Sequence, residues 1–107
     1  MVIIAELEFD LSYSDEKMGF RVFQPELDPE FNAWTCTFEI DDPIGVRRDI
    51  HGESSIQALV LALKTASAYL YGSDIYKNKQ MGVYGEFGGH LSIPATEMFL
   101  NIAPYPF

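Results

Sequence analysis

The sequence predicts an α+β fold: an antiparallel sheet of three to five strands with one long helix packed on one face, in strand-strand-strand-(strand)-helix order. Three observations predict it. Residues 2–11 and 31–40 alternate apolar and polar side chains, which is the two-residue period of a half-buried strand. Residues 52–72 instead repeat apolar side chains every three or four positions, as an amphipathic helix does. Prolines, glycines and aspartates with turn chemistry separate these segments.

The predicted helix is the segment around which the rest of the chain would pack. Ser54 and Gln57 have the spacing of a capping box, and Gly72 stands where a left-handed C-terminal cap is expected. Lys64 is the only charged side chain between these caps, so a second side of the helix should also be covered, by the C-terminal tail or by another subunit. The stripe expected to face the sheet consists of Ile56, Leu59, Leu63, Ala66 and Leu70.

The strand at residues 31–40 would supply the sheet side of the core. Its period of two places one set of side chains toward the helix, namely Trp34, Cys36, Phe38 and Ile40. Residues 19–24 predict another strand, which Pro25 ends, and residues 46–51 predict a shorter, more polar strand at a sheet edge.

The pattern weakens after Gly72. The glycine-rich residues 81–89 match neither a nucleotide-binding loop nor a dinucleotide fingerprint, so we expect turns or a bulge there. Residues 90–93 fit a short strand, and residues 96–102 fit either a short helix or a further strand.

Length and composition favour a single domain over residues 1–107 with a packed core, because 48% of the residues are hydrophobic. No apolar run is long enough to span a bilayer, and residues 1–5 lack the basic start and length of an export signal. We therefore expect a cytoplasmic protein. Cys36 is the single cysteine, which excludes an intrachain disulfide and a cysteine metal cluster.

The net charge of −9 is unevenly distributed. Residues 1–52 hold twelve acidic and four basic side chains, whereas residues 53–107 hold four and three. This acidity argues against binding to nucleic acid or to an anionic membrane, because phosphate neutralisation requires lysine and arginine. It is compatible with a basic protein partner and equally with plain solubility.

The chain resembles a small family of uncharacterised bacterial proteins, a domain of unknown function. The resemblance rests on a Trp34-x-Cys36-x-Phe38-x-Ile40 strand and on a helix that begins Gly-Glu-Ser and continues with Gln-Ala-Leu-x-Leu-Ala-Leu at residues 57–63. The family pattern has one serine where this chain has Ser54 and Ser55. The resemblance implies a bacterial, cytoplasmic α+β domain, and it carries no catalytic residue over to this chain.

Asp49, His51 and Glu53 form the best catalytic candidate, since a carboxylate beside an imidazole can tune it for acid–base chemistry. The alternative is a sheet edge with ordinary surface charges. These residues and His90 lack the spacing of a metal site, so no metal and no cofactor are expected.

Two sets of residues are candidates for protein binding. The strand period places Glu6, Glu8 and Asp10 on one sheet face, where they form either a solvated surface or a docking face for a basic partner. Apolar side chains outside the helix stripe are candidates for self-association or for burial by the tail; they are Val60, Leu61, Tyr69 and Tyr71.

The function that these features favour is a non-enzymatic binding module, such as an acidic immunity protein or an antitoxin-like inhibitor. The alternatives are a structural homo-oligomeric subunit, such as a homodimer, and a hydrolase that uses His51 or His90.

Overall fold

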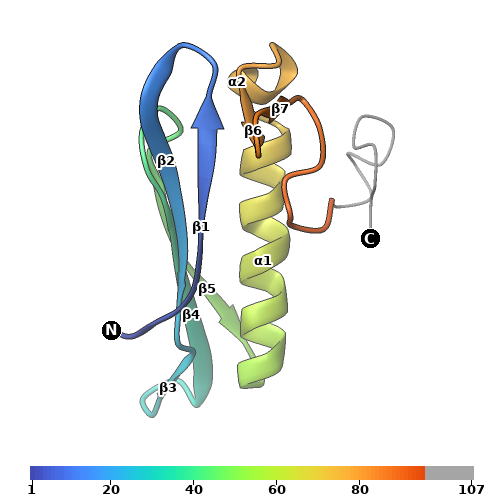
Figure 1. Cartoon of the computed structure of the whole chain (residues 1–107). Coiled ribbons are helices and arrows are strands. Elements are labelled where there is room, and N and C mark those ends of the chain that lie inside the picture. Colours follow the sequence, from blue (N-terminus) through green and yellow to red (C-terminus); the bar gives the residue numbers. More distant parts are fainter. Residues whose placement is uncertain (96–107) are drawn as a thin grey trace.

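The computed structural model describes residues 1–95, which form an antiparallel sheet with one main helix along one face (Figure 1). The helices are α1 (Ser55–Tyr71) and α2 (Asp74–Lys77). The strands are β1 (Ile3–Leu11), β2 (Ser14–Phe23), β3 (Glu26–Asp28), β4 (Ala33–Ile40), β5 (Val46–Gly52), β6 (Met81–Val83) and β7 (Glu86–Phe87).

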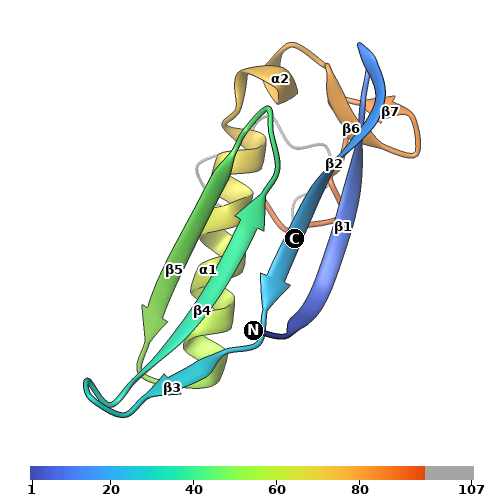
Figure 2. The ribbon, with the colours of Figure 1, turned by 90° about the vertical axis from the view of Figure 1, so that its left-hand side faces the viewer.

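Strand β4 pairs on both of its sides. One side pairs with β5, and the other pairs first with β2 and then with β3, which continues the line of β2 beyond Pro25. Strand β1 pairs with β2, and the short strands β6 and β7 follow beyond one end of β1 (Figure 2). The sheet therefore runs from β5 through β4, β2 with β3, β1 and β6 to β7.

The prediction of three to five strands is wrong, because residues 1–95 already form a sheet of seven strands. The three strands that the sequence did not predict are β3, β6 and β7, and each has only two or three residues. Such lengths are too short to show a period of two. Five strands, rather than three or four, precede α1, and α2 is a second helix of four residues.

Helix α1 begins and ends at the residues that its caps predict. Ser54 Oγ accepts a hydrogen bond from Gln57 N–H at 3.0 Å, and Gln57 Oε1 accepts one from Glu53 N–H at 2.6 Å. The first bond satisfies an amide that the first turn leaves without a partner, and the second satisfies the amide of the residue before the N-cap. Gly72 ends the helix with right-handed angles, φ −84° and ψ −6°, so the prediction of a left-handed cap is wrong.

The core lies between α1 and the inner face of the sheet. Cys36, Phe38 and Ile40 are buried on that face as predicted, and Trp34 is half-buried. The helix stripe is only partly as predicted, because Ile56 is 73% exposed and Leu63 is half-buried. The fully buried row is instead Ala58, Ala62, Ala66 and Leu70. Small alanine side chains allow the helix to approach the sheet closely.

Residues 88–95, the described part of the tail after β7, cover a second side of α1. Figure 1 shows this segment in orange on the side of α1 away from the sheet. Tyr71 O–H donates to Ile93 O at 2.9 Å and accepts from Leu91 N–H at 3.2 Å. Ser67 O–H donates to Pro94 O at 2.5 Å. The tail therefore provides part of the second cover that the apolar helix required. The helix or strand predicted at residues 96–102 lies outside the described residues.

Replacement of Gly52 by alanine is expected to destabilise the fold by about 1–3 kcal/mol, as overpacking does. A Cβ atom at Gly52 would lie 2.6 Å from Ala58 N and 2.9 Å from Ala58 Cα, so helix backbone would have to move. Urea unfolding of Gly52→Ala and of Gly85→Ala measures the effect. A Cβ at Gly85 meets nothing within 4 Å, although its φ of +76° adds backbone strain. A loss of less than about 0.5 kcal/mol for Gly52→Ala would contradict this close approach.

Candidate functional site

The outer face of the sheet, opposite α1, carries the acidic residues that the sequence singled out. Glu6, Glu8 and Asp10 alternate along β1 with Leu7, Phe9 and Leu11, which face the core. Glu6 and Glu8 are exposed and Asp10 is half-buried. The expectation that the three carboxylates share a face follows directly from the strand period.

The strand register places Glu6 in a row of alternating charges across four strands. Glu6 lies opposite Arg21, Arg21 opposite Glu39, and Glu39 opposite Arg47. Glu39 is 3.7 Å from Arg21 Nε and 3.6 Å from Arg47 Nη1. Arg21 is also bound by Asp41, and this carboxylate and Glu39 raise the pKa of its guanidinium. Among residues 1–95, Glu6 is the member of the row that forms no salt bridge.

The carboxylate of Asp10, unlike those of Glu6 and Glu8, binds other groups of the described chain. It binds Lys17 and accepts a hydrogen bond from Gly85 N–H at 2.9 Å. Hydrogen bonding to Lys17, and then to Gly85, lowers the pKa of Asp10. Asp10 therefore connects β1 to β2 and to the turn between β6 and β7, whereas Glu6 and Glu8 keep exposed carboxylates without a salt bridge in the described part of the chain.

Asp49 and His51 also lie on the outer face, but each contacts a threonine of β4. Thr37 O–H donates to Asp49 Oδ1 at 2.6 Å, and Thr35 Oγ1 is 3.0 Å from His51 Nδ1. His90 lies in the tail, where its Nδ1 accepts from Ser92 N–H at 3.1 Å. No group of three histidine, cysteine or acidic side chains within residues 1–95 has the geometry of a metal site. The structure therefore does not assemble the predicted catalytic candidate into a reactive pair.

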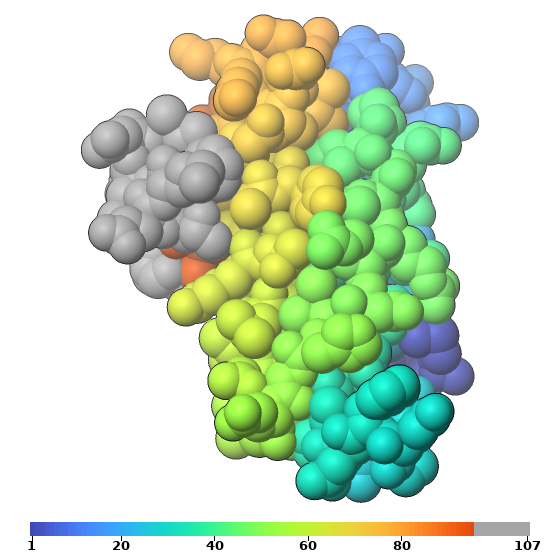
Figure 3. Space-filling model, turned by 180° about the vertical axis from the view of Figure 1, so that it is seen from behind, coloured from blue at the N-terminus to red at the C-terminus, as the bar shows by residue number. Residues whose placement is uncertain are grey.

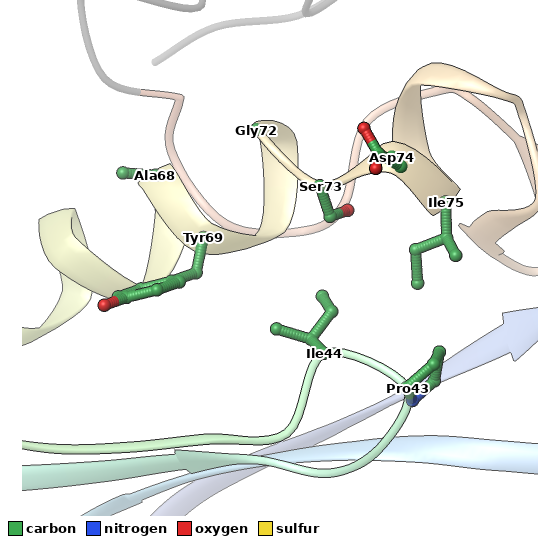
Figure 4. A pocket seen from close by; sticks show the side chains of 8 residues that line it. All are labelled: Pro43, Ile44, Ala68, Tyr69, Gly72, Ser73, Asp74 and Ile75. Carbon is green, nitrogen blue, oxygen red and sulfur yellow. The ribbon is translucent and has the colours of Figure 1, made fainter.

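A cleft of about 480 Å³ lies between the turn after β4 and the C-terminal end of α1 (Figure 4). Pro43 and Ile44 line one wall, and Tyr69 lies across from them. Tyr69 O–H accepts a hydrogen bond from Arg48 at 2.8 Å, and its ring packs at 6.2 Å from that of Phe38. The remaining lining residues are Ala68, Gly72, Ser73, Asp74 and Ile75. Ser73 and Asp74 are neighbours in this lining, but the Ser73 hydroxyl donates to Leu70 O at 2.7 Å and accepts from Tyr76 N–H at 3.3 Å, so it serves as the N-cap of α2.

The four candidate self-association residues have different environments. Val60 and Leu61 are 42% and 38% exposed. Figure 3 shows α1, in yellow and yellow-green, at the surface beside the green strands. Tyr69 is half-buried by the contacts just described, and Tyr71 is fully buried. Tyr71 therefore belongs to the core and is removed from any surface. Ile56, which was assigned to the core stripe, is instead exposed beside Val60.

Cys36 is a core residue, as expected. It is fully buried, and its Sγ lies 3.4 Å from Phe23 O. Burial raises the pKa of this thiol, which suppresses the reactive thiolate. The glycine-rich segment forms the hairpin of β6 and β7, where Tyr84 and Gly85 have φ values of +54° and +76°. Its predicted role in a turn is confirmed.

These features define a small α+β domain with an open, acidic sheet face. The chain belongs to the family described as Domain of unknown function (DUF6968), which matches residues 5–95. The expected resemblance to an uncharacterised domain family is thereby confirmed. No curated protein and no solved structure matches the chain. No helix in the described part of the chain has the length and hydropathy needed to cross a bilayer.

Proposed function

We propose that this protein is a non-enzymatic binding module that docks a basic protein partner on the outer face of its sheet. The observation that carries the proposal is the imbalance of charge on that face. Within residues 1–95, Arg21, Arg47 and Lys17 form salt bridges with Glu39, Asp41 and Asp10, whereas Glu6 and Glu8 form none and can bind an external cation.

The most specific form of the proposal is an inhibitor of a basic toxin, that is, an immunity protein or an antitoxin. Such an inhibitor requires an exposed complementary surface rather than a reactive centre. An acidic face also accelerates encounter with a basic partner by long-range attraction. The net charge of −9 supports this mechanism.

Reversal of both glutamates, Glu6→Lys with Glu8→Lys, is expected to slow association with a basic partner about tenfold or more at low salt. The wild-type protein and the variant serve as baits, bound proteins are identified by mass spectrometry, and their association rates are measured by surface plasmon resonance. The wild-type rate should fall as salt rises, because screening acts within about 10 Å at 0.1 M.

The matched control is Glu30→Lys with Glu53→Lys, which changes the net charge equally at exposed positions outside β1. A partner that is lost with the β1 variant and retained with the control supports the proposal. Equal loss in both variants would instead indicate a dependence on net charge alone, and retention by both would exclude this face.

A second candidate function is a structural homo-oligomeric subunit. The exposure of Ile56, Val60 and Leu61 on one region of α1 favours it, because exposed apolar patches mark interfaces. Sedimentation of the wild-type protein and of Val60→Ser with Leu61→Ser tests it. A concentration-dependent dimer that these substitutions dissociate would support this alternative, and a wild-type monomer at high micromolar concentration would exclude it.

A further inference from the structure

Among residues 1–95, one edge of strand β1 pairs with no other strand over most of its length. In the described part of the chain, Ile3 and residues 5–9 of β1 pair with β2 alone, and β6 pairs with Asp10 and Leu11. Figure 2 shows β6 and β7 at one end of β1, and no other strand of residues 1–95 on that side of β1. An unpaired edge presents backbone N–H and C=O groups to which another strand can add.

The direction of the backbone groups identifies which residues face this edge. Ser12 N–H donates to Gln80 O at 2.9 Å, toward the side on which β6 lies. Backbone groups alternate between the two sides of a strand. The register with β2 shifts between Ile3 and Ala5 and again between Phe9 and Leu11, but it is continuous from Ala5 to Phe9. Gly19 O accepts from Asp41 N–H toward β4, so Gly19 and Arg21 direct their backbone groups away from β1. Their partners Glu8 and Glu6 therefore direct theirs away from β2, to the free edge. Glu6 and Glu8 therefore offer backbone donors and acceptors as well as carboxylates.

Strand β6 ends where the free edge begins. A cleft of about 420 Å³ lies at this step, lined by Leu7, Glu8, Val83 and Tyr84, with Asp10, Lys17 and Ser92. Tyr84 is 93% exposed and has a φ of +54°, and the chain turns there from β6 into β7, which pairs with β6. A strand added beside β1 would lie in line with β6 and would start beyond Val83, where β6 ends.

We propose that the free edge of β1 binds an extended segment of the basic partner as an added antiparallel strand, which rests on the function proposed above. Glu6 and Glu8 lie two residues apart, which matches the period of a strand with lysine or arginine at alternate positions. Ile3 and Ile4 are 46% and 47% exposed and offer an apolar contact farther along the strand. A second copy would bring the same glutamates and a net charge of −9, so charge favours a basic segment.

The probe is a seven-residue synthetic peptide of alternating valine and lysine with blocked ends, added to the full chain. NMR measures binding and the hydrogen exchange of individual amides. The peptide should bind and slow the exchange of the Glu6 and Glu8 amides, and higher salt should weaken it. A matched peptide with glutamate in place of lysine should bind at least tenfold more weakly.

Glu6→Pro and Glu6→Gln separate the contribution of the backbone N–H to peptide binding from that of the carboxylate. Both remove the carboxylate, but only proline removes the N–H that faces the edge; β2 pairing is retained, since edge strands tolerate proline in this orientation. Loss of one exposed ion pair should weaken peptide binding about fivefold at most in Glu6→Gln. Glu6→Pro should weaken it at least tenfold more.

The outcomes separate this inference from the proposed function. Peptide binding that is equal in Glu6→Pro and Glu6→Gln, without protection of the two amides, would overturn strand addition and leave an acidic docking face. Absence of binding by the lysine peptide would overturn both. Protection that depends on protein concentration alone would assign the edge to a second copy, and slow exchange in the free monomer would show that the chain itself covers it; either result overturns the inference.

Discussion

Replacement of Tyr71 by alanine is expected to destabilise the protein by about 3–5 kcal/mol, the range for removal of a buried aromatic side chain. Tyr71 is fully buried, and its ring packs edge-on to that of Tyr76 with centroids 5.0 Å apart. Its hydroxyl also joins α1 to the tail through Leu91 N–H and Ile93 O. A total stability of about 5–15 kcal/mol is usual for a small domain, so this loss would be a large fraction of it.

Tyr71→Phe separates the ring from the hydroxyl. It keeps the packing but leaves a buried amide and a buried carbonyl without their partner, which should cost about 1–3 kcal/mol. Denaturant unfolding of the wild-type protein and both variants gives the comparison. If Tyr71 were instead a self-association residue, Tyr71→Ala would change sedimentation and leave the unfolding free energy of the monomer nearly unchanged.

The major elements were predictable because each has a side-chain pattern that repeats over many consecutive residues and depends only on near neighbours in the sequence. The alternation in β1 and β4, and the capping residues Ser54 and Gln57, each lie within a few residues of sequence. Strands β3, β6 and β7 were not predictable, because two or three residues hold no period and gain their pairing from distant partners. For this reason the number of strands was underestimated.

The candidate site likewise has some features that local sequence predicts and others that depend on distant residues. The shared face of Glu6, Glu8 and Asp10 follows from local alternation. The free edge beside them does not, because it depends on β6 reaching only Asp10 and Leu11, a pairing between residues about seventy positions apart. The neutralisation of Arg21 by Asp41 is equally non-local. The burial of Tyr71 depends on the tail, where the sequence pattern was weakest.

Leu70→Ala is expected to cost about 2–5 kcal/mol, whereas Ile56→Ala should change stability by less than about 0.5 kcal/mol. Both residues belong to the stripe that the sequence assigned to the core, but Leu70 is fully buried and Ile56 is 73% exposed. Ile56 and Ala58 are two residues apart, which is about 200° around a helix. A helix that buries the row of Ala58, Ala62 and Leu70 therefore turns Ile56 toward solvent.

This comparison tests the orientation of α1 directly. The two substitutions place alanine in the same helix, so the difference between them reports burial and not helix propensity alone. Urea unfolding at two protein concentrations measures both variants, since a concentration-dependent effect of Ile56→Ala would reveal an interface at the exposed end of the helix. Equal losses of more than about 2 kcal/mol at both positions, independent of concentration, would show that the helix faces the sheet through the predicted stripe instead.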